Sequence, residues 1–324
     1  MHWDRACIGR ARLDGRGRAA PDDGYSSRVP SQPSASPPGN GTSPTGEPAA
    51  AASAEVERVV AVILTYRRTD LLRGSVRAVL GQTRAPDLVL VVDNDRMASE
   101  VLASEEAGER LEVLETGSNL GPAGGYEFGF REALARGATK VWTVDDDLVP
   151  EPRCLERLLA ASRGADVLIP LQRKPGLVKG HPPSWNGTLF DAAIVGQVGL
   201  PRGDLFFWAE DTEFYQRIRR AGFAIRPVED AAVFHVNPED RERGSSRDWR
   251  LYYEVRNGLY VRLVLRPRTA KGTWRAWRSA LGKLGAIIVL EPHKRRSIGL
   301  WWQGYRDYRR RRLGKVVAPE RWEG

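Results

Sequence analysis

The 324-residue sequence contains only two cysteines, Cys7 and Cys154, and four histidines. Two cysteines exclude a disulfide scaffold and a cysteine-rich zinc site, because both need more thiols. The apolar run at residues 285–290 is too short to span a bilayer, which takes about 20 residues. Apolar residues make up 41% of the sequence, which at this length is sufficient for one large domain or two small domains with a buried core.

The formal net charge of +9 is concentrated at one end of the chain. Residues 266–324 carry sixteen Lys or Arg against four acids, whereas residues 55–265 carry a net charge of −4. A nucleic-acid-binding domain normally includes its basic face within the fold. We therefore expect no nucleic-acid partner.

Composition divides the chain into three segments. Residues 1–54 are rich in Pro, Gly, Ser and Ala without apolar periodicity, which predicts a disordered tail. They also lack the apolar core of a signal peptide. Residues 55–265 have the pattern of a folded catalytic body, and residues 266–324 read as a basic amphipathic helical segment.

Short β-branched runs alternate with helical patterns in the body, which predicts an α/β fold with a mainly parallel, Rossmann-like sheet flanked by helices. The expected strands lie at 59–64, 88–92, 111–114, 141–144, 167–169 and 189–195. The expected helices follow Thr69 and Gly121 and cover about 151–161 and 212–221.

Polar triplets follow three of the expected strands. In a parallel sheet, ligands bind outside the carboxyl ends of the strands, so these triplets are candidates for a binding site. Asp and Asn also suit plain turns, but clustered carboxylates repel one another unless a cation or a proton joins them. The triplets are Thr65-Tyr66-Arg67, Asp93-Asn94-Asp95 and Asp145-Asp146-Asp147.

Two pairs of acids suit chemistry on a diphosphate-linked substrate. Asp145 and Asp147 offer oxygen ligands to Mg²⁺ or Mn²⁺, although a lone Asp-x-Asp also fits a solvated turn. Glu210 and Asp211 suit a general base, and equally the first turn of a helix. His235 is either a further metal ligand or a structural histidine.

Together these motifs resemble the inverting nucleotide-sugar transferases of glycosyltransferase family 2, which have the GT-A fold. The resemblance spans about residues 59–262. Two segments, Asn-Leu-Gly-x-Ala-Gly-Gly (119–125) and Tyr-Tyr-x-x-Arg-Asn (252–257), are most similar to actinobacterial galactofuranosyltransferases and rhamnosyltransferases of cell-wall polysaccharide synthesis. The other matching segments are Val-Ile-Leu-Thr-Tyr-Arg-Arg (62–68), Val-Val-Asp-Asn-Asp (91–95), Val-Asp-Asp-Asp (144–147), Trp-Asn-Gly (185–187), Glu-Asp-x-Glu-Phe (210–214) and His235.

The resemblance implies a role for each matching residue. Asp211 would be the catalytic base, with Glu210 as the alternative because the two are adjacent and the register is open. The metal ligands would be Asp145, Asp147 and His235. The donor-binding residues would be Thr65, Tyr66, Arg67, Asp93, Asn119, Gly121, Gly124, Gly125, Asp146, Trp185, Asn186 and Trp208, of which the aromatic residues also suit packing.

The resemblance implies a metal-dependent enzyme that moves galactofuranose from UDP-galactofuranose to a hydroxyl of a lipid-linked or cell-wall glycan. Three alternatives stay open: a dTDP-rhamnose-dependent rhamnosyltransferase, a non-catalytic nucleotide-sugar-binding protein, and an oxidoreductase. The last is disfavoured because Gly121-x-x-Gly124-Gly125 neither follows the first strand nor matches G-x-G-x-x-G. The sequence leaves open whether the protein forms an oligomer.

Aromatic and basic residues are interleaved in the C-terminal segment, for example Trp301-Trp302 near Arg309-Arg310-Arg311-Arg312. This pattern suits an anionic membrane surface, or a helical subdomain with solvated basic faces. We expect a cytoplasmic enzyme that is peripheral at the inner face of the cell membrane, close to a lipid-linked acceptor.

Overall fold

The computed structural model describes residues 57–105, 108–174, 177–236, 248–265, 267, 269–291 and 293–318. The chain divides into two units, Met1–Ala54 and Glu55–Gly324. The predicted disordered tail at residues 1–54 lies outside the described residues, so the account below concerns the second unit.

The described residues form a nine-stranded sheet in the order β3-β2-β1-β4-β8-β6-β9-β5, with β7 paired to β6. Strands β3, β2, β1 and β4 are parallel to one another, and β6 is parallel to β9. The antiparallel pairs are β4 with β8, β6 with β8, β6 with β7, and β5 with β9. The mainly parallel sheet predicted from the sequence is confirmed, with a mixed half beyond β4. The strands are β1 Val59–Thr65, β2 Leu88–Asp93, β3 Leu111–Glu115, β4 Lys140–Asp145, β5 Leu148–Pro150, β6 Asp166–Lys174, β7 Leu177–Gly180, β8 Leu189–Asp191 and β9 Ala224–His235.

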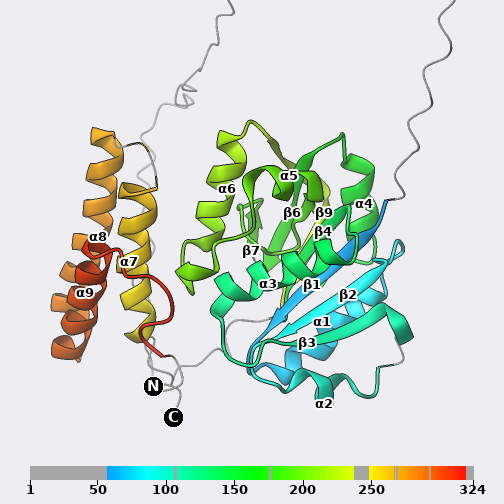
Figure 1. Ribbon diagram of the computed structural model, residues 1–324, viewed down its shortest axis with the longest axis horizontal. Coiled ribbons are helices and arrows are strands. Elements are labelled where there is room, and N and C mark those ends of the chain that lie inside the picture. Colours follow the sequence, from blue (N-terminus) through cyan, green and yellow to red (C-terminus); the bar gives the residue numbers. More distant parts are fainter. Residues whose placement is uncertain are drawn as a thin grey trace, which may run out of the picture. The chain divides into compact units, whose positions relative to one another are not determined.

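Helices cover both faces of the sheet (Figure 1). Alternate residues of β1 point to opposite faces, so Ile63 packs with α1, α2 and α4, while Val62 and Leu64 pack with α3, α5 and α6. Each face of the sheet therefore has its own apolar core. These helices are α1 Thr69–Leu80, α2 Ala98–Leu102, α3 Gly121–Ala135, α4 Cys154–Ala161, α5 Ala192–Val198 and α6 Glu210–Arg220, with 3-10 turns η1 Gly108–Arg110 and η2 Gly203–Leu205.

The register of the parallel strands brings the polar triplets together. Thr65 at the end of β1 pairs with Asp93 at the end of β2, and Leu64 pairs with Asp145 at the end of β4. Since all three strands run in the same direction, their carboxyl ends share one edge of the sheet. This edge forms one wall of the site described below.

The structure differs from the sequence prediction in the second half of the body. The strand expected at 189–195 ends at Asp191, whose side chain accepts a hydrogen bond of 2.9 Å from Ala193 N and so starts α5. Helix α6 begins at Glu210 rather than Thr212, which places the candidate acid pair in its first turn.

Three C-terminal helices pack on one another (Figure 1). They are α7 Asp248–Leu263, α8 Ala270–Leu290 and α9 Lys294–Arg309. Trp301 of α9 is buried and donates a hydrogen bond of 2.8 Å from Nε1 to Ala280 O of α8. Helix α7 precedes the predicted boundary at 265/266 yet belongs to this packing, and the domain boundaries stay a prediction.

Candidate active site

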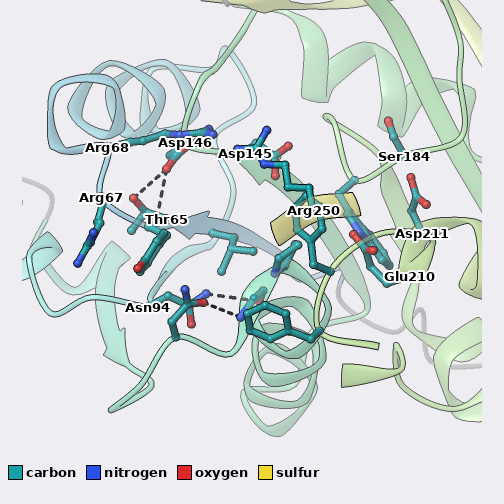
Figure 2. Close-up of a pocket in the computed structure, with 18 of the residues that line it drawn as sticks. Thr65, Arg67, Arg68, Asn94, Asp145, Asp146, Ser184, Glu210, Asp211 and Arg250 are labelled. Atoms are coloured by element: carbon teal, nitrogen blue, oxygen red, sulfur yellow. Dashed lines mark hydrogen bonds and ion pairs between the residues drawn. The ribbon is translucent and has the colours of Figure 1, made fainter. Parts of the chain in front are cut away.

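A cavity of about 590 Å³ lies at the carboxyl edge of β1, β2 and β4. Its walls come from the strand ends, the N-terminus of α3, the first turn of α6 and the first turn of α7. In Figure 2, Glu210 and Asp211 lie across the pocket from Thr65 and Arg67, with Arg250 between them. The lining residues are Leu64, Thr65, Tyr66, Arg67, Arg68, Asn94, Asn119, Gly121, Pro122, Asp145, Asp146, Ser184, Trp185, Asn186, Phe206, Phe207, Glu210, Asp211, Trp249 and Arg250.

The pocket gathers most of the site residues expected from the sequence. The first and last of these residues are more than 140 positions apart in the sequence, so it is the fold that brings them together. They are Thr65, Tyr66, Arg67, Asn119, Gly121, Asp145, Asp146, Trp185, Asn186, Glu210 and Asp211.

Asp93, expected among the donor-binding residues, does not line the pocket. It is fully buried, and its carboxylate accepts hydrogen bonds from the backbone N–H groups of Asp95, Arg96 and Ala98 at 2.7–2.9 Å. These bonds shape the turn before α2. The neighbouring Asn94 lines the pocket instead.

Gly124 and Gly125 also lie outside the pocket lining. A Cβ on Gly125 would stand 2.3 Å from Leu64 Cδ1, and one on Gly124 would stand 2.8 Å from Leu120 Cβ. Gly125 therefore allows α3 to approach β1 closely, whereas a side chain at Gly124 would collide with Leu120 at the start of α3. Gly121, with φ +68°, is the glycine of this segment that lines the pocket.

Asp146 is held by the segment after β1. Its Oδ2 accepts a hydrogen bond of 3.0 Å from Thr65 Oγ1, and its Oδ1 accepts one of 2.9 Å from Arg68 Nη1. Burial raises the pKa of Asp146, and the Arg68 guanidinium partly opposes this rise. Arg68 also lies 3.3 Å from Asp147 Oδ2, so one arginine bridges two acids of the triplet.

Asp145 lines the pocket and receives a hydrogen bond of 2.6 Å from the Tyr126 hydroxyl. Burial, followed by the carboxylate of Asp147, raises the pKa of Asp145 to about 7, and the Tyr126 hydrogen bond opposes this rise. Near neutral pH this carboxyl group therefore titrates readily, and a nearby cation would favour its charged form.

The three predicted metal ligands are only partly brought together. His235 Nδ1 lies 3.7 Å from Asp147 Oδ1, and His235 Nε2 lies 3.0 Å from Asn186 Nδ2. Asp147 and His235 do not line the pocket, whereas Asp145 does. Among the residues that the structure describes, no three His, Cys, Asp or Glu side chains form a group that could hold a metal ion.

Glu210 and Asp211 occupy the first turn of α6, where the positive end of the helix dipole favours acids. Burial and then the Asp211 carboxylate raise the pKa of Glu210 to about 8. Burial also raises the pKa of Asp211. Two adjacent carboxyl groups with raised pKa values are suited to accept a proton near neutral pH.

A second cavity, of about 370 Å³, lies against the same acid pair. Trp208 lines this cavity instead of the first one and is 45% exposed. Gly258, Val261 and Arg262 of α7 form part of the opposite wall. The Glu210–Asp211 pair is thus shared by two cavities.

Several pocket residues were given no role by the sequence analysis. Arg68 and Asn94 belong to motifs that it singled out, so the motifs themselves pointed toward them. Trp249 and Arg250 come from α7, and the Arg250 guanidinium lies over the rings of Phe207 and Trp249 at 5.8 and 5.4 Å. No spacing in the sequence connects α7 with the strand ends.

Comparison with known proteins agrees with this geometry. Residues 60–184 match the family model described as glycosyl transferase family 2. Galactofuranosyltransferase GlfT1 of Mycobacterium tuberculosis is 32% identical over 213 residues, which cover 55% of this chain and 70% of the relative. The chain belongs to glycosyl transferase family 2. This glycosyltransferase is therefore an enzyme, and the pocket at the strand ends is its candidate active site.

Solved structures place this glycosyltransferase in the GT-A fold. The mannosyltransferase PcManGT from Pyrobaculum calidifontis, in complex with GDP-Man and Mn²⁺, matches with a TM-score of 0.51 and 15% identity, covering 75% of this chain and 73% of that one. S. aureus TarS 1-349 in complex with UDP-GlcNAc matches with a TM-score of 0.53 and 14% identity, covering 78% and 80%.

Proposed function

We propose that this enzyme transfers galactofuranose from UDP-galactofuranose, with inversion, to a hydroxyl of a lipid-linked or cell-wall glycan. The observation that carries the proposal is the position of the Glu210–Asp211 pair between two cavities. An inverting displacement needs a donor on one side and an attacking hydroxyl on the other. The similarity to GlfT1 supports the choice of donor sugar.

Asp211 is the proposed catalytic base. Its carboxylate takes the proton from the acceptor hydroxyl as that oxygen attacks the anomeric carbon, and the nucleoside diphosphate leaves from the opposite face. The raised pKa of Asp211 brings its basicity closer to neutral pH than that of an exposed aspartate. Glu210, more deeply buried, is the alternative base.

The proposed metal ion is Mg²⁺ or Mn²⁺, held by Asp145, Asp147 and His235. The chemistry of these side chains suits such an ion, because carboxylates are its preferred protein ligands. A cation would also favour the charged form of Asp145, whose pKa is raised by burial and then by Asp147. When bound, the ion would neutralise charge on the donor diphosphate. Asp145 is the member that faces the pocket.

The nucleotide is proposed to bind beside Thr65, Tyr66 and Arg67. An adjoining cavity of about 560 Å³ shares Tyr66 and Arg67 with the main pocket and is also lined by Asp95. Asp95 Oδ2 accepts a hydrogen bond of 2.6 Å from Arg67 N. We propose that Asp95, rather than Asp93, is the acid beside the nucleotide.

The acceptor is proposed to enter by the second cavity, where the exposed ring of Trp208 offers a flat surface for a sugar.

No helix of the described residues is both long and apolar enough to cross a membrane. Helix α8 supports surface association instead, because Trp274, Leu281 and Ile288 are exposed at intervals of seven residues.

A donor screen tests the proposal. Purified protein with Mn²⁺ or Mg²⁺ is incubated with UDP-galactofuranose, dTDP-rhamnose, UDP-glucose and UDP-galactose, and nucleotide release is measured with and without EDTA. We expect EDTA-sensitive UDP release from UDP-galactofuranose. Release only from dTDP-rhamnose would favour the rhamnosyltransferase alternative, and release from none of the four would overturn the proposed donor.

A further inference from the structure

The loop that precedes the acid pair has an unusual backbone. Phe206, Trp208 and Ala209 have φ values of 63°, 74° and 66°, although none of them is glycine. Such conformations are costly for residues with a Cβ and persist only where the surroundings enforce them. Because Glu210 directly follows Ala209, whatever fixes this loop also fixes the acid pair.

Asn257 of α7 binds this loop through three backbone carbonyl groups. Its Nδ2 donates to Leu205 O at 2.8 Å, Phe207 O at 2.7 Å and Trp208 O at 3.1 Å. Arg256 Nη2 donates to Leu205 O at 2.9 Å, and Arg256 Nε donates to Asn257 Oδ1 at 2.8 Å. The last bond orients the amide so that its NH₂ group faces the loop. We call Arg256 and Asn257 the α7 clamp.

Both clamp residues are fully buried, which is unusual for an arginine. The guanidinium lies over the rings of Tyr253 and Tyr252 at 4.9 and 5.2 Å, and Nη1 donates to Gly314 O at 2.7 Å. The bond from Nε to Asn257 and those to the carbonyl groups fix the guanidinium further. A charged group that is desolvated and bonded in this way has little freedom to move.

The other side of the loop rests on α3. Ala123 N donates to Phe206 O at 3.2 Å. A Cβ on Gly121 would stand 2.2 Å from the same oxygen. The loop is therefore held between the N-terminus of α3, which lines the donor pocket, and α7.

We infer that Arg256 and Asn257 are positioning residues for the catalytic carboxylates, acting through the backbone of residues 205–209. Neither residue lines the pocket, so they do not touch the substrate. Their bonds maintain the strained backbone that directs Glu210 and Asp211 toward the substrates. The inference rests on the proposed role of that acid pair.

The test compares Asn257→Leu with Trp301→Phe. The first keeps the volume of the side chain and removes its three donated bonds. The second removes a buried hydrogen bond between α9 and α8 that does not involve the loop. We expect Asn257→Leu to lower kcat for UDP release about 100-fold, the effect of a misplacement near 1 Å, with the Kd of UDP changed less than threefold. Trp301→Phe should leave kcat within twofold.

Two further variants separate positioning from folding. Arg256→Lys keeps the charge but loses the planar fork, and Asn257→Ser keeps one donor, so both should lower kcat about tenfold with the Kd of UDP unchanged. Hydrogen exchange of the peptide spanning residues 203–214 should be faster in every clamp variant than in wild type or Trp301→Phe. Equal kcat losses for clamp and control variants at equal loss of thermal stability would overturn the inference.

The exchange measurement also keeps this inference distinct from the proposed function. If the wild type released nucleotide from no donor, the proposed function would fail while the exchange comparison still tested the clamp. Unchanged exchange in Asn257→Leu would refute the clamp whatever the donor.

Discussion

The hydroxyl of Tyr126 donates a 2.6 Å hydrogen bond to Oδ1 of Asp145, while the Tyr126 ring stacks on Trp185 with the ring centroids 4.7 Å apart. The bond joins the acid at the end of β4 to the aromatic cluster beneath α3. Because the hydroxyl favours the charged form of Asp145, it sets how far burial can raise the pKa of that group.

Tyr126→Phe should shift the pH dependence of catalysis. Without the hydrogen bond, the pKa of Asp145 rises above its present value of about 7, so more of the carboxyl group is protonated at pH 6.5. One bond to a charged group corresponds to a shift of about one pKa unit. We expect kcat/KM to fall about tenfold at pH 6.5 and to recover to within threefold at pH 8.5. A profile identical to that of wild type and of the control Tyr308→Phe would contradict this.

The choice of base is tested by comparing two neighbours. Asp211→Asn should lower kcat by about 10²–10⁴-fold, the usual contribution of a general base, while Glu210→Gln lowers it less. Glu213→Gln, one turn further along α6, is the matched control and should keep kcat within twofold, because Glu213 bonds to Arg217 instead of facing the pocket. A larger loss in Glu210→Gln than in Asp211→Asn would assign the base to Glu210.

The buried Glu210 should make stability fall as the pH rises. Its pKa is about 8 in the folded protein and near 4.5 when unfolded, so the folded state binds more protons between these values. Unfolding free energy therefore decreases from pH 5 to pH 8. Glu210→Gln should flatten this slope and stabilise the protein by about 1–3 kcal/mol at pH 8.

Urea unfolding at pH 5, 6.5 and 8 measures this effect. Glu213→Gln serves as the control: it removes the negative charge and one of the two acceptor oxygens that lie 2.9 and 3.0 Å from Arg217 Nε, so it should destabilise the protein. If Glu210→Gln were destabilising at pH 8, the burial penalty assigned to Glu210 would be wrong.

Gly121→Ala should disturb both stability and catalysis. The position has φ +68°, and the new Cβ would collide with Phe206 O at 2.2 Å in the loop before the acid pair. We expect a loss of about 1–3 kcal/mol in unfolding free energy together with a lower kcat. Gly196→Ala in α5 has nothing within 4 Å of its Cβ and should be stabilising by about 0.5–1 kcal/mol. Thermal unfolding of both variants tests whether the change in stability has opposite signs in the two proteins.

The sequence predicted the elements that carry a strong local pattern. The apolar run of β1 and the parallel order of β1, β2 and β4 follow from periodicity and alternation, and the strand-end triplets mark the edge where the pocket lies. At Asp191 a single cap decided between strand and helix, and the preceding apolar stretch could not show this.

The direction in which each side chain of a motif points could not be predicted from the sequence. Asp93 and Asn94 stand in one motif, yet Asp93 turns inward to bond three backbone N–H groups while Asn94 lines the pocket. Arg250 reaches the pocket only because α7 packs beside the loop before α6. That contact depends on tertiary packing between segments about 40 residues apart, and no motif spacing encodes it.

Association of α8 with an anionic lipid surface gives the last prediction. Trp274, Leu281 and Ile288 are 60%, 52% and 52% exposed, and residues seven apart share one helix face. Replacing all three with serine should lower binding to anionic vesicles at least tenfold in a flotation assay, because each buried apolar side chain contributes about 1.5–3 kcal/mol. The control Val178→Ser changes an equally exposed apolar residue on β7, 62% exposed, and should bind like wild type. Binding by wild type should weaken with salt, since basic residues flank this face. Equal flotation of the triple variant and wild type at low salt would exclude this face as the lipid contact.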